Sequence, residues 1–262
     1  MSKSYSKRYF DEIQNGSLLS AIEVIPLVNT IVAPNSVIDV GCGTGAWLSI
    51  WEKHGVLDIL GVDGPYIQKE QLLFDTEQFY SHNLEEPLVL TRKFDLAMCL
   101  EVAEHIKESN ATGFVDSLCK LSEVVLFSAA IPDQGGRLHY NEQYPQYWID
   151  KFALYDFEPF DTLRPQIWEN SKINACYRQN ILLFVHNDSA TRFENRLLPK
   201  QRILPLVHPV HFKHKEDIIN SYQRILRTPL HAIWYFIKQY SNRLISIFHN
   251  GSKDGSRIDR YK

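Results

Sequence analysis

The sequence predicts an α/β protein with a mainly parallel sheet of seven strands, helices on both faces of the sheet, and a helical C-terminal extension. The main observation is an alternation, because short β-branched runs and segments of helical periodicity follow one another from residue 36 to residue 130. Such a βαβ order is typical of parallel sheets, which bind their ligands at the carboxyl ends of the strands. The second observation is size, since 262 residues suit one domain with an appendage.

Each predicted element has its own signal in the sequence. Apolar residues at helical spacing predict a first helix at residues 18–32, which Pro34 ends. The run SVIDVG predicts the first strand at residues 36–41. Further strands are predicted at residues 57–62, 79–82, 94–100, 124–130, 157–163 and 177–186, and further helices at residues 45–54, 110–121 and 143–154.

The chain is expected to have three regions. They are a domain at residues 1–187, a proline-punctuated linker at residues 188–215, and a basic amphipathic helical extension at residues 216–262. Pro229 is expected to kink or divide the extension, because proline removes a helical hydrogen bond. The last dozen residues are expected to fray.

Charge is distributed unevenly along the chain. Residues 191–262 contain 14 basic and 5 acidic residues, a net charge of +9, whereas residues 1–190 carry a net charge of −12. The acidic part argues against nucleic-acid binding, which needs clustered cations. For the basic extension three roles stay open: packing on the acidic domain, formation of a homodimer, and contact of the amphipathic helix with an anionic membrane surface.

The composition and the N-terminal sequence suggest a cytoplasmic protein. No uninterrupted apolar run reaches the roughly 18 to 20 residues that a membrane span requires, and no apolar stretch follows the first lysines. The four cysteines form no CxxC pair, so reduced thiols are expected.

A glycine-rich motif, DVGCGTG, lies between the first predicted strand and its helix at residues 39–45, and we call this segment the glycine loop. Glycines let the backbone approach a ligand where a β-carbon would collide. Asp63 ends the next strand, at a spacing that suits a carboxylate accepting both hydroxyls of a ribose. Because the loop lacks both the dinucleotide pattern and the Lys-Ser/Thr of a phosphate loop, S-adenosylmethionine fits best, with a plain tight turn as the alternative.

Several motifs resemble those of the class I S-adenosylmethionine-dependent methyltransferases. They are VIDVGCGTG at residues 37–45, GVDG at residues 61–64 and FDLAMCLEVAEHI at residues 94–106. The segments AAIPDQGGRLHYNEQYPQYW (residues 129–148) and YRQNILLFV (residues 177–185) are also similar to bacterial methyltransferases of surface-polysaccharide gene clusters. The resemblance implies a Rossmann-like fold, S-adenosylmethionine as cofactor, and O-methylation of a sugar or sugar-linked small molecule in capsule or lipopolysaccharide biosynthesis.

The same resemblance implies roles for individual residues. Asp63 would hold the ribose hydroxyls, Asn83 and Leu84 would contact the adenine, and Glu101 would face the methionine end of the cofactor. The residues expected to line the methionine and the ribose are Asp39, Gly41, Gly43 and Gly45.

Two histidines are candidates for the base that takes the acceptor's proton. His105 follows the fourth predicted strand, and its structural alternative is a residue at a helix start that is bonded to Glu101 or Glu104. His139 follows the Gln134-Gly135-Gly136 segment, and its alternative is a solvated loop position. The residues expected to bind the acceptor around these histidines are Gln134, Tyr140, Asn141 and Glu142.

Two alternative functions stay open. The acceptor could be an amine, a carboxylate or a phosphoryl oxygen, or the protein could be a non-catalytic scaffold that binds S-adenosylmethionine. The histidine run at residues 208, 211 and 214 has metal-like spacing, but prolines interrupt its segment, so no metal site is expected.

Overall fold

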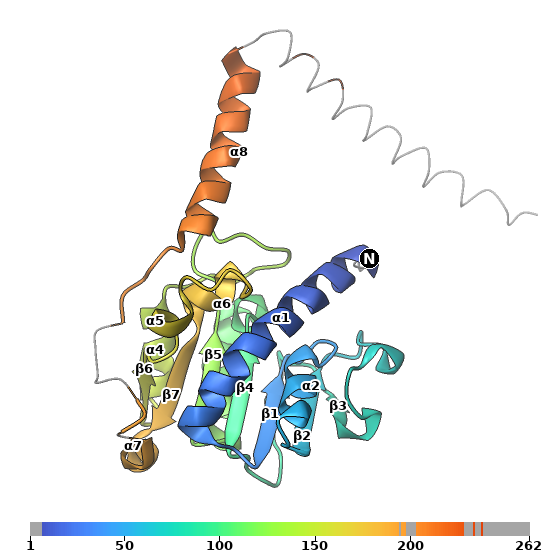
Figure 1. Ribbon diagram of the computed structural model, residues 1–262, viewed down its shortest axis with the longest axis vertical. Coiled ribbons are helices and arrows are strands. Elements are labelled where there is room, and N and C mark those ends of the chain that lie inside the picture. Colours follow the sequence, from blue (N-terminus) through green and yellow to red (C-terminus); the bar gives the residue numbers. More distant parts are fainter. Residues whose placement is uncertain (1–6, 194, 198–202, 228–232, 234–236, 238–262) are drawn as a thin grey trace, which may run out of the picture. The chain divides into compact units, whose positions relative to one another are not determined.

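The computed structural model describes residues 7–193, 195–197, 203–227, 233 and 237. A sheet of seven strands has the order β3-β2-β1-β4-β5-β7-β6 (Figure 1). Strands β1 to β5 pair in parallel, and β7 runs antiparallel to both of its neighbours, β5 and β6, so six of the seven strands have the same direction. The strands are β1 (Ser36–Val40), β2 (Asp58–Asp63), β3 (Phe79–Ser81), β4 (Leu96–Leu100), β5 (Val124–Ser128), β6 (Phe157–Phe160) and β7 (Leu182–His186). The predicted sheet is therefore confirmed.

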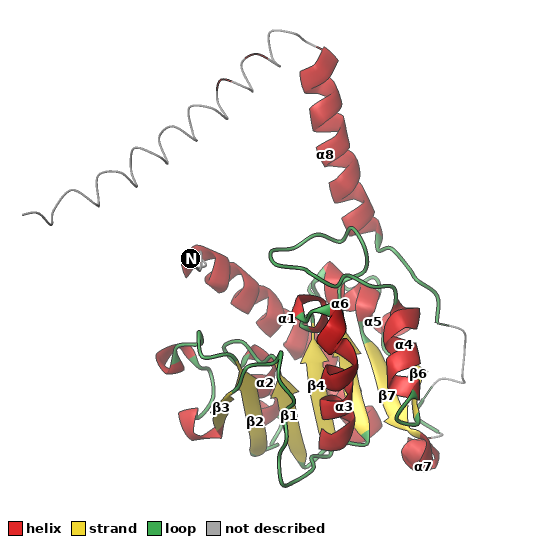
Figure 2. Ribbon diagram, turned by 180° about the vertical axis from the view of Figure 1, so that it is seen from behind, coloured by secondary structure: helices red, strands yellow, loops and turns green. Residues whose placement is uncertain are grey.

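Helices cover both faces of this sheet. One face carries α1 (Lys7–Val32) and α2 (Ala46–Lys53), and the other carries α3 (Ala111–Leu121) and α4 (Pro145–Ala153), as Figures 1 and 2 show. Two short helices, α5 (Arg164–Ile167) and α6 (Ala175–Asn180), lie between β6 and β7, and α7 (Asn187–Ala190) follows β7. Five 3-10 helices complete the description: η1 (Lys69–Gln71), η2 (Thr76–Gln78), η3 (Ala103–His105), η4 (Glu108–Asn110) and η5 (Thr191–Phe193).

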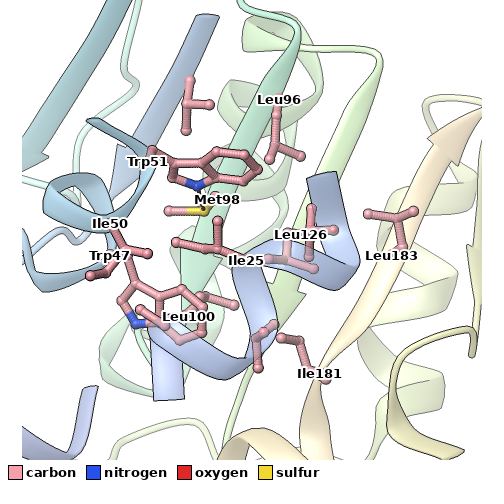
Figure 3. Close-up of a cluster of buried hydrophobic side chains, with 14 of the residues drawn as sticks. Ile25, Trp47, Ile50, Trp51, Leu96, Met98, Leu100, Leu126, Ile181 and Leu183 are labelled. Atoms are coloured by element: carbon pink, nitrogen blue, oxygen red, sulfur yellow. Dashed lines mark hydrogen bonds between the residues drawn. The ribbon is translucent and has the colours of Figure 1, made fainter. Parts of the chain in front are cut away.

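The strand residues alternate between two hydrophobic clusters, one on each face, because successive strand side chains point in opposite directions. Along β4, Leu96 and Met98 face the cluster under α1 and α2, whereas Ala97 faces the cluster under α3 and α4. In the first cluster the indole nitrogen of Trp51 donates to Met98 Sδ over 3.2 Å, and both side chains pack beside Ile25 of α1 (Figure 3). The continuous apolar strands of the sequence are thus buried on both faces, as parallel sheets require.

Within α1, the segment Asn15–Val32 is long and apolar enough, by length and composition alone, to cross a membrane. Its mean hydropathy is 1.4, and 33% of it is buried inside the structure. Val24, Ile25 and Val28 are fully buried in the first cluster. These contacts are those of a helix that packs on a sheet.

Within the domain, three predicted elements differ from the observed ones by three residues or more or in their type. Residues 177–181 were expected to begin the last strand, but 177–180 belong to α6, whose polar residues make side-chain hydrogen bonds instead of a strand ladder. The first helix begins at Lys7 instead of residue 18, and the sixth strand ends at Phe160 instead of residue 163.

The C-terminal extension begins earlier than expected, since α8 (Pro209–Arg227) starts in the region predicted as linker. Pro209 is tolerated because the first residue of a helix needs no amide donor. The chain divides into two compact units between His208 and Pro209. The expected kink at Pro229 and the expected fraying of the last dozen residues lie outside the described residues.

Candidate active site

The glycine loop connects β1 to α2 at the carboxyl edge of the sheet. Its three glycines have positive φ angles of 87° at Gly41, 55° at Gly43 and 81° at Gly45. Residues other than glycine rarely adopt such angles. Gly41 N donates to Val62 O of β2 over 2.7 Å, and Gly45 N donates to Cys42 O over 2.8 Å. The backbone of the loop is therefore tied both to itself and to the neighbouring strand.

The three glycines face different surroundings. A β-carbon at Gly41 would lie 2.3 Å from a methyl group of Val102, and a β-carbon at Gly45 would lie 2.2 Å from the ring of Phe74. At Gly43, by contrast, no described atom would lie within 4 Å of a β-carbon. Packing thus requires two of the glycines, whereas the middle glycine borders open space that a ligand can enter.

Asp63, at the end of β2, borders the same space with a carboxylate that is only 4% exposed. Its Oδ2 accepts a hydrogen bond from Gly43 N over 2.7 Å, and its Oδ1 accepts from Gly64 N over 2.6 Å and from the hydroxyl of Tyr66. Open space next to glycine backbone, bounded by a buried carboxylate that already accepts a hydroxyl, fits the ribose and methionine of S-adenosylmethionine. Sequence analysis missed Tyr66, which follows Gly64-Pro65 and reaches back to the aspartate.

Asp39 lies on β1 below the glycine loop and is 3% exposed. Burial, together with the neighbouring charge of Asp63, raises the pKa of Asp39 to about 8. In the unfolded chain this carboxyl group would ionise near its ordinary pKa of 3.8. Between these two values the folded state holds a proton that the unfolded state has lost.

We therefore expect Asp39 to make the protein less stable as the pH rises from about 4 to about 8, with no further loss above that. Replacing it with asparagine removes this titration. The free energy of unfolding of Asp39→Asn relative to wild type should rise by about 1.4 kcal/mol per pH unit inside the window. Urea unfolding of both proteins at several pH values measures the difference. If the free energies of unfolding of the two proteins showed the same dependence on pH, Asp39 would not be protonated in the folded state.

The glycine loop and Asp63 form the first wall of the site, and the end of β4 forms the second. Glu101 has a positive φ of 56°, a strained conformation for a residue with a side chain. Its amide donates to Ser128 O, and its carboxylate accepts from Gln134 Nε2 over 2.8 Å and from Asn180 Nδ2 over 3.1 Å. Gln134 Oε1 accepts from Asn180 and from Gln179 in turn. Both oxygens of Glu101 are thus held by amide groups from the loop after β5 and from α6.

Gln179 and Asn180 are site residues that sequence analysis missed. Both are buried, at 1% and 5% exposed, because α6 ends against the carboxyl edge of the sheet. The signal was present as two adjacent amides directly before an apolar strand, but the segment was assigned to that strand.

The third wall is a cluster around η3 and the loop after β5. His105 Nδ1 lies 3.0 Å from Leu138 O, and His139 Nδ1 lies 2.7 Å from Glu142 Oε1. The two imidazole rings meet edge to face, with centroids 4.8 Å apart. Glu104 is 1% exposed, and its backbone carbonyl accepts from Tyr140 N and Asn141 N. The two candidate bases thus lie side by side, and neither Glu101 nor Glu104 bonds to the His105 ring as the structural alternative required.

Burial controls the ionisation of this cluster. It raises the pKa of Glu104 well above its ordinary value, and the nearby charge of Glu101 raises it further. Burial also raises the pKa of Glu101, although hydrogen bonds from Asn180, Gln134 and Ser128 oppose this. The pKa of His105 is lowered by burial, which the hydrogen bond to Leu138 O partly offsets. The site therefore holds carboxyl groups that ionise reluctantly next to a histidine that favours its neutral form.

The other predicted residues follow β5 or β3 in the chain. Asn141 is buried, Tyr140 is 62% exposed, and Glu142 also accepts from the amides of Asp133 and Gly135, so it ties the loop after β5 together. Asn83 is exposed after β3, where its oxygen accepts from Glu85 N. Leu84 packs against the cluster under α3 and α4. The adenine contact of Asn83 and Leu84 stays a prediction.

The fold, the glycine loop and Asp63 together define a class I S-adenosylmethionine-dependent methyltransferase. The chain belongs to the methyltransferase domain family, whose sequence profile matches residues 11–166. Its cofactor is S-adenosylmethionine. No curated protein matches the sequence.

Solved structures with the same fold include several methyltransferases. The sugar N-methyltransferase KedS8 from Streptoalloteichus sp. ATCC 53650 is 13% identical, with a TM-score of 0.54 over 71% of this chain and 97% of that chain. DesVI from Streptomyces venezuelae is 12% identical, with a TM-score of 0.52 over 70% and 99% of the two chains. The magnesium protoporphyrin IX methyltransferase ChlM from Synechocystis PCC 6803, solved with bound S-adenosylmethionine, is 20% identical, with a TM-score of 0.51 over 70% and 86%. At these identities the similarity shows the fold alone.

Proposed function

We propose that this methyltransferase methylates a hydroxyl oxygen of a sugar or a sugar-linked small molecule in bacterial surface-polysaccharide biosynthesis. The observation that carries the proposal is the pair of adjacent imidazoles after β4 and β5, at the same edge of the sheet as the glycine loop. Val102 contacts Gly41, so the η3 segment with His105 is held next to the cofactor loop. A hydroxyl acceptor must lose a proton during transfer, and neutral imidazoles are suited to assist this.

The transfer is a displacement at the methyl carbon of the sulfonium. A lone pair of the acceptor oxygen forms the new carbon–oxygen bond, and the electrons of the carbon–sulfur bond pass to sulfur, which leaves as neutral S-adenosylhomocysteine. The acceptor proton leaves towards the histidine pair. Alignment of oxygen, carbon and sulfur can supply about 7 to 11 kcal/mol of the barrier. Gln134, Tyr140 and Asn141, together with Glu142, are the proposed acceptor-binding residues.

Replacement of His139 by alanine should therefore lower turnover by about 10² to 10⁴ while leaving the affinity for S-adenosylhomocysteine unchanged. The side chain lies in the loop after β5, outside the hydrophobic clusters, so the fold should persist. Transfer of radiolabelled methyl groups to a panel of sugars and sugar nucleotides measures the rate, and calorimetry measures the affinity. His54→Ala, at the exposed end of α2, is the matched control.

The alternatives predict other results. Near-normal rates in His105→Ala and His139→Ala would favour a carboxylate or phosphoryl oxygen as acceptor, because these oxygens are already anionic. Binding of S-adenosylhomocysteine without transfer to any acceptor would favour a non-catalytic scaffold. Without such binding the proposal fails entirely.

A further inference from the structure

Three side chains of the active site lie close enough to share one metal ion. Glu104, His105 and His139 each offer a ligand atom, and these atoms all lie within 4.8 Å of one another. Two of the residues come from η3 after β4, and the third comes from the loop after β5. The fold thus brings together, from two segments far apart in the sequence, two imidazoles and one carboxylate.

The carboxylate of Glu104 gives independent support for a ligand at this point. Its Oε2 is buried, and among the residues that the structure describes it has no hydrogen-bond partner. A buried polar atom without a partner is costly and calls for an explanation such as a bound ion. Glu101, three residues earlier, differs in this respect, because amide groups hold both of its oxygens.

Both histidines have an oxygen partner at Nδ1, as metal-binding histidines commonly do. The partners of their Nδ1 atoms, Leu138 O and Glu142 Oε1, are a carbonyl and a carboxylate oxygen, which accept hydrogen bonds. Each Nδ1 therefore donates, and in the neutral tautomer the Nε2 of each ring presents a lone pair. Metal-binding histidines typically donate their other ring N–H to a carboxylate or a backbone carbonyl in this way, which fixes the tautomer.

We infer that Glu104, His105 and His139 bind a divalent transition metal ion, with Glu142 and Leu138 O holding the two imidazoles in place. Two imidazoles and one carboxylate suit ions such as Zn²⁺ and its substitute Co²⁺ better than Mg²⁺, which prefers oxygen ligands. Three protein ligands leave coordination positions open, which is typical of catalytic sites.

The role of the ion rests on the proposed O-methylation and changes the route of the proton, because imidazoles bound to the ion no longer take the acceptor proton themselves. An acceptor hydroxyl bound at an open position would lose its proton more readily, because a bound cation favours the alkoxide. The proton would pass to solvent, the oxygen would attack the methyl group, and the sulfonium would take up the electron pair. The two histidines would then promote deprotonation of the hydroxyl indirectly, by holding the ion.

Co²⁺ titration of the full chain, after removal of bound metal with a chelator, tests the inference directly. We expect one equivalent of Co²⁺ to bind with a change in its visible absorption, and Zn²⁺ to displace it. Glu104→Gln and His139→Ala should each weaken binding by about 100-fold or more, and Glu142→Gln by about 10-fold, because loss of an orienting partner costs about 10- to 100-fold. His54→Ala and His214→Ala, both exposed, should bind as wild type does.

Several results would overturn the inference. They are the absence of Co²⁺ binding, unchanged binding in both Glu104→Gln and His139→Ala, and loss of binding in His214→Ala, which would place the ion on the histidine run at residues 208–214. Circular dichroism verifies folding, and if buried Glu104 cannot be replaced, His139→Ala decides the question. The titration needs no cofactor, so its failure with intact S-adenosylhomocysteine binding would remove only this inference. Failure of cofactor binding would instead remove the proposed function.

Discussion

Replacement of Asp63 by alanine is expected to weaken the binding of S-adenosylhomocysteine by about 100-fold or more. Hydrogen bonds to a charged group contribute about 1.5 to 3 kcal/mol each, and 1.4 kcal/mol corresponds to a factor of ten in affinity. The variant loses the predicted acceptor for the ribose hydroxyls and also the bond that holds Gly43 N. Isothermal titration calorimetry of wild type and variant measures the effect.

Asp58 provides the matched control for this experiment. It is an exposed aspartate at the start of β2, the strand that Asp63 ends, and its carboxylate pairs with Arg92 over 2.5 Å. Asp58→Ala should leave the affinity unchanged. Equal affinity in Asp63→Ala and wild type would show that the ribose binds elsewhere, and the assignment of the cofactor site would then fail.

Replacement of Gly45 by alanine is expected to destabilise the fold by about 2 to 5 kcal/mol. A left-handed conformation costs a side-chain-bearing residue about 1 to 2 kcal/mol, and a β-carbon 2.2 Å from the Phe74 ring adds an overpacking cost of about 1 to 3 kcal/mol. Urea unfolding followed by circular dichroism measures the loss.

Variants of two other glycines distinguish the cost of backbone strain from the cost of the contact with Phe74. Gly55→Ala introduces the same strain, at a φ of 88°, without a described atom in its way, so it should cost only about 1 to 2 kcal/mol. Gly43→Ala should also cost little stability, but its methyl group would enter the space assigned to the cofactor and weaken S-adenosylhomocysteine binding. A Gly45→Ala variant as stable as Gly55→Ala would contradict the contact with Phe74.

Much of the cofactor site could be predicted from local sequence. Gly41 and Gly45 are recognisable because a strand that turns directly into a helix needs positive φ angles, and Asp63 because it ends the next buried strand. The network of Glu101 with Gln134 and Asn180 could not be predicted. Its members come from three segments, and hydrogen-bonding amides carry no periodic signal.

The sequence by itself determined the sheet, the glycine loop, Asp63 and the cofactor class, because hydrophobic periodicity and turn chemistry act between near neighbours in the chain. Only the tertiary structure decided that His105 and the buried Glu104, from the segment after β4, meet His139 from the loop after β5. These contacts depend on which strand ends become adjacent and on the path of the loop after β5. Both are set by the packing of the whole domain.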